Sequence, residues 1–182
     1  MKELAQDCGM SVANLYRYYD GKLALGAAVA AGEQAALFEA CDRAIATVQE
    51  NVTAKLIALF HALIDGTRRQ IKSAPLLFEL GMAVAREQPE HRQRILQETE
   101  ARIVAILAAG EGASASMRAD AEVAGQLILL ACAPFVLPWM LQTQPFGNPR
   151  PQVEPLVTYL VSGLTKAAGT GGVATVHPDD PS

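Results

Sequence analysis

Asn14 and Arg17 lie three positions apart near the start of the chain, and both side chains can pair with the edges of DNA bases. Asparagine suits adenine, whereas arginine suits guanine or a phosphate. The neighbouring Tyr16 and Tyr18 each carry a hydroxyl that can donate to a phosphate oxygen, and small Ala13 would let their helix approach the major groove. The set indicates contact with double-stranded DNA; the alternative for the two tyrosines is ordinary surface packing.

Two short helices joined by a sharp turn would position these side chains. The apolar residues of Lys2–Cys8 fall on one helical face, and Gly9 follows, a residue that readily adopts the left-handed conformation that ends a helix. Ser11 is then a good N-cap, because its hydroxyl can accept from an unpaired amide of the next turn. The pattern predicts a second helix over Val12–Tyr18.

The segment resembles the helix-turn-helix of the TetR family of bacterial transcriptional regulators. The resemblance implies that Val12–Tyr18 is the recognition helix, that Tyr16, Tyr18 and Lys22 contact phosphates, and that four other residues read the bases. Those four are Ser11, Ala13, Asn14 and Arg17. The matching residues are Leu4-Ala5-Gln6-Asp7-Cys8-Gly9-Met10-Ser11, then Leu15-Tyr16-Arg17-Tyr18-Tyr19, Lys22 and Leu25.

One feature departs from the family pattern. In the family another helix precedes this segment and packs across it, whereas this chain begins at Met1, inside the second helix. The resemblance therefore implies an incomplete DNA-binding head that lacks helix 1. The basic footprint usual for a DNA site is also missing from the segment. Its basic residues Lys2, Arg17 and Lys22 are balanced by Glu3, Asp7 and Asp20.

The composition of the whole chain favours close-packed helices. Of its 182 residues 51% are hydrophobic but only 5% aromatic, and the net charge of −4 argues against general polyanion binding. Three widely spaced cysteines predict neither disulfides nor a zinc site, so we expect a cytoplasmic protein. The longest apolar run, Leu127–Leu141, is shorter than the ~20 residues of a membrane span and contains two prolines. We therefore expect no membrane contact.

Apolar periodicity predicts an all-α body behind the head. A long connecting helix from Asp20 to about Val48 leads into it. The chain then divides into a head (1–46), an effector-binding and dimerisation bundle (47–168) and a disordered tail (169–182). The predicted helices of the bundle are Thr53–Lys72, Pro75–Arg86, Pro89–Ala109, about 118–144 with a kink at Pro134 and Pro138, and 152–168.

The last two helices have more apolar surface than a small bundle can bury, which favours a homodimer through 118–144 and 152–168. The resemblance implies the same interface. A two-fold dimer would present two recognition helices to one operator.

Regulators of this family hold a small effector within the body. The candidate pocket residues are Phe60, His61, Phe78, Met82, Phe135, Trp139 and Met140. Each has ordinary core packing as its alternative, and for His61 the alternatives are a polar anchor in an apolar pocket or a boundary histidine bonded to a carbonyl. Few charged residues fall on inward faces, which favours an apolar or aromatic effector.

The three histidines lack metal-ligand spacing, and no nucleophile lies near a base, so we expect no metal, no cofactor and no enzyme activity. Two hypotheses remain. The first is a ligand-responsive, dimeric transcriptional regulator, most often a repressor in this family. The alternative is a dimeric helical small-molecule-binding protein that does not bind DNA because its head is truncated.

Overall fold

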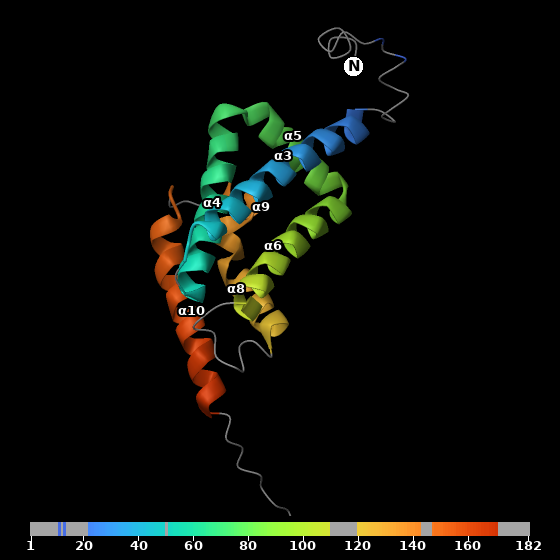
Figure 1. Cartoon of the computed structure of the whole chain (residues 1–182). Helices are drawn as coiled ribbons and strands as arrows, with labels where there is room; N and C mark the ends of the chain where they lie inside the picture. Colours follow the sequence, from blue (N-terminus) through green and yellow to red (C-terminus); the bar gives the residue numbers. More distant parts are fainter. Residues whose placement is uncertain are drawn as a thin grey trace, which may run out of the picture.

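A computed structural model describes residues 11, 13, 22–49, 51–109, 120–142 and 147–170, and all regular structure in these ranges is helical (Figure 1). The all-α fold class expected from the sequence is confirmed. The helices are α3 (Lys22–Ala46), α4 (Val52–Ser73), α5 (Pro75–Glu87), α6 (Pro89–Ala109), α8 (Ala121–Val136), α9 (Pro138–Leu141) and α10 (Arg150–Thr170).

Local chemistry explains most helix starts. Pro75 begins α5 and Pro89 begins α6, where the missing N–H costs no helical hydrogen bond. Asn51 caps α4, because its side-chain oxygen accepts from the Ala54 amide at 3.1 Å. Thr53, the predicted first residue of this helix, instead lies within its first turn.

The predicted helix over 118–144 differs most from the structure. Helix α8 continues through Pro134 and ends at Val136, and the one-turn helix α9 follows after Leu137. Leu137 is extended (φ −80°, ψ 133°) because the ring of Pro138 disfavours the helical conformation in the residue before it. The predicted kink is therefore a complete break at the second proline.

Two other predicted ends are shifted. The connecting helix α3 ends at Ala46 rather than near Val48. Helix α10 begins at Arg150 instead of residue 152 and extends to Thr170, so residues 169 and 170 of the predicted tail are helical. The turn before α10 contains Gly147 at φ +69°, a conformation that glycine adopts without steric cost.

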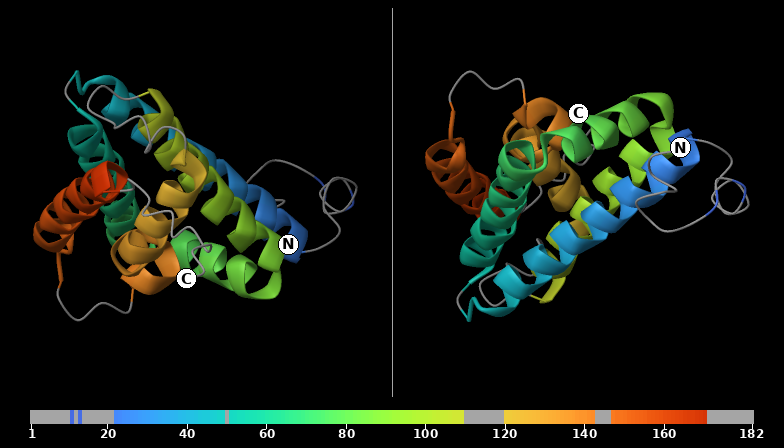
Figure 2. Two further views of the ribbon diagram at one scale, coloured as in Figure 1. Left: turned by 90° about the horizontal axis from the view of Figure 1, so that it is seen from below. Right: turned by 90° about the horizontal axis from the view of Figure 1, so that it is seen from above.

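The helices form one bundle around a common core. Helix α3 packs against α4 and α5, α6 against α5 and α8, and α10 against α4 and α8. Figures 1 and 2 show α3 and α6 side by side, with α10 on the opposite side of the bundle. The connecting helix therefore borders a different surface from the last helix.

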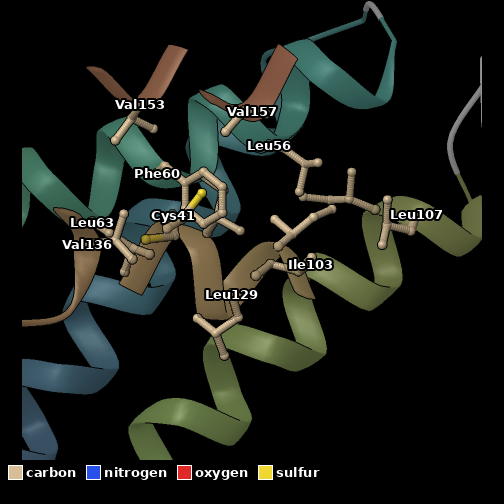
Figure 3. Close-up of a cluster of buried hydrophobic side chains, with 14 of the residues drawn as sticks. Cys41, Leu56, Phe60, Leu63, Ile103, Leu107, Leu129, Val136, Val153 and Val157 are labelled. Atoms are coloured by element: carbon tan, nitrogen blue, oxygen red, sulfur yellow. The ribbon is translucent and has the colours of Figure 1, made fainter. Parts of the chain in front are cut away.

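Side chains from α3, α4, α6, α8 and α10 fill the core (Figure 3). Phe60 of α4 is its largest fully buried side chain, and α10 contributes Val153 and Val157. The core also contains two free thiols, Cys41 of α3 and Cys132 of α8, both 0% exposed. Burial is the main reason that the pKa of each thiol is raised to about 12.

Gly125 lets α8 approach α6 closely. A Cβ at this position would lie 2.8 Å from Cγ2 of Val104, a β-branched side chain with little freedom to rotate. We expect Gly125→Val to lower the free energy of unfolding by about 1 to 3 kcal/mol, as overpacked cores do. Urea denaturation followed by circular dichroism measures the change.

The matched control is Gly32→Ala, also within a helix but with nothing within 4 Å of the added Cβ. This substitution should raise stability by about 0.5 to 1 kcal/mol, because alanine loses less backbone entropy on folding. Equal stability of Gly125→Val and the natural chain would show that the α6–α8 crossing is looser than described.

Candidate functional site

A groove runs between α3 and α6 and encloses about 270 Å³. We call it the α3–α6 groove. Its walls are formed by Ala31, Gln34, Ala35, Phe38, Glu39 and Asp42 of α3 and by His91, Arg94, Ile95, Glu98 and Arg102 of α6. Its volume is near the lower end of the range for small-molecule sites, roughly 300 Å³ and above. The groove borders the connecting helix from Ala31 to Asp42.

Arg102 closes one end of the groove by joining α6 to α3. Its guanidinium donates to both carboxylate oxygens of Asp42, at 2.8 and 2.9 Å, and to Glu98 at 2.8 Å. It also lies over the Phe38 ring, 4.2 Å from the ring centroid. Burial lowers the pKa of Arg102, but the hydrogen bonds to Asp42 and Glu98 outweigh it and leave the pKa raised. Arg102 therefore stays charged and links the two helices through its ion pair with Asp42.

A second, smaller cavity of about 50 Å³ is lined mainly by residues of α3, α5, α6 and α9. Phe78 and Met82 of α5 and Trp139 of α9 line it, together with Ala30 of α3. We call it the inner cavity. As described it holds no more than a few waters, since one water occupies about 30 Å³ of liquid.

The structure thus brings together three of the seven predicted pocket residues, namely Phe78, Met82 and Trp139. Phe60 is 0% exposed within the core and packs among core side chains (Figure 3). Phe135 and Met140 are half-buried and pack against the same core cluster.

His61 belongs to a polar cluster between α4 and α10. Its Nδ1 lies 2.8 Å from an Arg150 guanidinium nitrogen, which can only donate, so Nδ1 accepts and the proton of the neutral ring is on Nε2. Nε2 is 3.1 Å from Glu154 but poorly aligned for a hydrogen bond. Arg150 also donates to Asp65 at 3.1 Å.

Burial, then the charge of Arg150, lowers the pKa of His61 despite Glu154 and Asp65, which favours the neutral ring. One prediction for His61 was a hydrogen bond to a carbonyl, but in the structure its hydrogen-bond partner is Arg150. The cluster ties α10 to α4, and Arg68 of α4 adds a hydrogen bond to the carbonyl of Gly147 before α10.

The predicted DNA contacts fall mainly outside the described residues. Asn14, Tyr16, Arg17 and Tyr18 lie there, whereas Ser11 and Ala13 are exposed and Ala13 is helical. Lys22 is the first residue of α3, and its side chain is not among those described. The DNA contacts therefore stay predictions.

None of the seven predicted pocket residues lines the α3–α6 groove, and two polar residues that do line it are Gln34 and His91. Gln34 interrupts the inward stripe of α3, four residues after Ala30 and four before Phe38. His91 lies four residues before buried Ile95 on α6 and is itself 8% exposed. The signal was available: a polar residue at helical spacing within an apolar stripe.

Among the residues that the structure describes, no three His, Cys, Asp or Glu side chains are grouped so that they could hold a metal ion. None of the helices in the same ranges combines the length and the apolar character that crossing a membrane requires.

An all-helical body with a long helix leading in from the N-terminal segment, and with cavities beside that helix, defines a class of helical bundles suited to binding small molecules. Residues 52–157, more than half of the chain, match the family described as Tetracyclin repressor-like, C-terminal domain. The chain belongs to this family, which confirms the TetR assignment made from the head. Neither the curated proteins nor the solved structures include a match.

The matched region begins at the first residue of α4 and ends within α10. It excludes the head, so the family is established by a part of the chain independent of the helix-turn-helix resemblance. Two separate segments thus indicate the same family, which is one of ligand-binding regulators.

Proposed function

We propose that the chain is a ligand-responsive, dimeric DNA-binding transcriptional regulator of the cytoplasm, acting as a repressor that a small apolar or aromatic effector releases from its operator. In this proposal residues 1–46 are the DNA-binding head, 47–168 the effector-binding and dimerisation domain, and 169–182 a tail. The chain would act by binding and carry no enzyme activity.

One observation carries the proposal: α3, which follows directly on the predicted recognition helix, forms a wall of the α3–α6 groove. A ligand in this groove would contact the connecting helix itself. If it binds one position of α3 better than another, it shifts the population between DNA-competent and DNA-incompetent forms. The groove therefore supports coupling between effector and head.

The outer face of α8 supports the dimer. Val123, Leu127 and Leu130 are 59%, 49% and 74% exposed, at the i, i+4, i+7 spacing of one helical face. The opposite face of α8 is buried in the core, so apolar residues lie on two faces of this helix. Helix α10, which packs beside α8, exposes Tyr159. A second copy covering α8 and α10 would bury this surface.

DNA binding by the full chain tests the proposal. We expect saturable shifts of genomic fragments that flank the gene, weakening steeply between low and physiological salt because lysine and arginine contacts release counterions. Asn14→Ala and Arg17→Ala should each weaken binding to the preferred fragment by roughly 10- to 100-fold, the value of a good base contact.

The control is Gln97→Ala, an exposed position on α6 far along the chain from the head, which should leave DNA binding unchanged. Absence of specific binding to any fragment would overturn the regulator proposal. The chain would then be a dimeric helical small-molecule-binding protein without DNA binding, the alternative carried from the sequence.

A further inference from the structure

The α3–α6 groove and the inner cavity meet at the same three residues. Gln34, His91 and Ile95 line both. The two spaces are therefore adjacent, with Gln34 of α3 and His91 of α6 at the junction between them. A ligand that occupies both spaces must pass these two polar side chains.

Gln34 has an unused hydrogen-bond donor at this junction. Its Nε2 is buried and has no hydrogen-bond partner in the described part of the chain. Buried amide nitrogens are almost always paired, because an unpaired buried donor is energetically costly. An acceptor atom supplied by a ligand would satisfy it.

His91 is the second polar group at the junction. It is 8% exposed, and its ring makes no hydrogen bond with the residues that the structure describes. Burial, then the charge of Arg94, lowers the pKa of His91 although Glu90 opposes the shift. At neutral pH the ring is thus uncharged and offers one donor and one acceptor.

The charged residues of the groove lie at its mouth. Glu39, Asp42, Arg94 and Glu98 are exposed, and the less exposed Arg102 is neutralised by Asp42 and Glu98. Beyond the shared residues, the inner cavity is bordered by apolar side chains, among them Phe78, Met82 and Trp139, and by the exposed Glu33, which accepts a hydrogen bond from Gln70 at 3.1 Å. A charged ligand group at the junction would lose its water without gaining an opposite charge, so a neutral group is favoured.

We propose that Gln34 and His91 are the hydrogen-bonding anchor of a single effector site, and that its ligand is a neutral molecule with an apolar or aromatic body and an acceptor such as a carbonyl. The inference rests on the proposed function in treating these cavities as the effector site. The body of the ligand lies in the α3–α6 groove, the carbonyl meets Gln34 and His91, and a small apolar end enters the inner cavity.

Four probes of similar size test the chemistry on the full chain: acetophenone, ethylbenzene, benzoate and benzylamine. Binding is measured by calorimetry and by the indole N–H resonance of Trp139, the single tryptophan of the chain. We expect acetophenone to bind at least ~10-fold more tightly than each of the other three, which corresponds to one well-formed hydrogen bond or one avoided buried charge.

Two substitutions test the anchor. Gln34→Leu and His91→Leu should each reduce the preference for acetophenone over ethylbenzene to within about threefold, because they remove the polar partner and keep the apolar volume. His91→Gln, which retains a donor and an acceptor, should keep most of the preference. The control Gln93→Leu changes an exposed glutamine on α6 and should alter neither affinity.

Three results would overturn the inference: no acetophenone binding up to its solubility, tighter binding of benzoate or benzylamine, or an unchanged preference in both leucine variants. Each is separable from failure of the proposed function. If the chain binds DNA specifically but any of these three results is found, the regulator proposal holds and the anchor proposal fails. If the probes bind as expected but the chain does not bind DNA, the anchor proposal holds and the regulator proposal fails.

Discussion

Phe60→Ala is expected to lower the free energy of unfolding by about 3 to 5 kcal/mol, the usual cost of truncating a fully buried phenylalanine. Phe60 is 0% exposed and lies among core side chains of several helices (Figure 3). The loss combines the transfer of the removed ring to water with the cavity that the neighbours cannot fill. Because small domains are marginally stable, most of the total stability would be lost.

Urea denaturation at fixed protein concentration measures this change, with Leu76→Ala as the control. Leu76 is 79% exposed on α5, and truncating it should change stability by no more than about 0.5 kcal/mol. If Phe60→Ala lowers the free energy of unfolding by less than about 1 kcal/mol and also weakens acetophenone binding, Phe60 lines the effector pocket and is not a core residue. That is the position that the sequence alone suggested.

Leu130→Glu is expected to weaken the proposed dimer at least ~100-fold, as substitution at the centre of an interface does. Leu130 is 74% exposed on the outer face of α8, and a second copy would bury it. The introduced carboxylate would then lose its water in an apolar contact with no cation to pair with. Sedimentation velocity across a range of concentrations measures the dissociation constant.

Leu76→Glu is the matched control, since it introduces the same charge at an equally exposed leucine of α5. It should leave the dimer intact. A natural chain that sediments as a monomer, or a Leu130→Glu chain that dimerises as well as the natural one, would contradict the interface on α8 and α10.

Local signals predicted the helices well because each acts within a few residues. Pro75 and Pro89 mark helix starts through the missing N–H, and the apolar stripe of α4 follows the helical period. The break at Leu137 is also a local effect, but either of two nearby prolines, Pro134 or Pro138, could have caused it. Choosing Pro138 over Pro134 required knowing that the helix tolerates Pro134 in its interior.

The candidate site was less predictable because its geometry depends on contacts between distant residues. Arg102 and Asp42 are sixty positions apart, and nothing in either stretch indicates that they pair. Gln34 and His91 line the same groove only because α3 and α6 lie side by side. The sequence favoured aromatic and methionine residues for the pocket, and such residues fill the core and line cavities with equal ease, as Phe60 and Phe78 illustrate.

The rate at which the two buried thiols are alkylated would report how often the helical bundle opens. Alkylating reagents attack thiolates, and a pKa of about 12 leaves on the order of one thiolate in ten thousand at pH 8. Labelling of Cys41 or Cys132 must therefore proceed through transiently opened forms, at a rate set by how often they occur. With Cys8 replaced by serine, mass spectrometry of the two labelled peptides would time the release of α3 and of α8 separately.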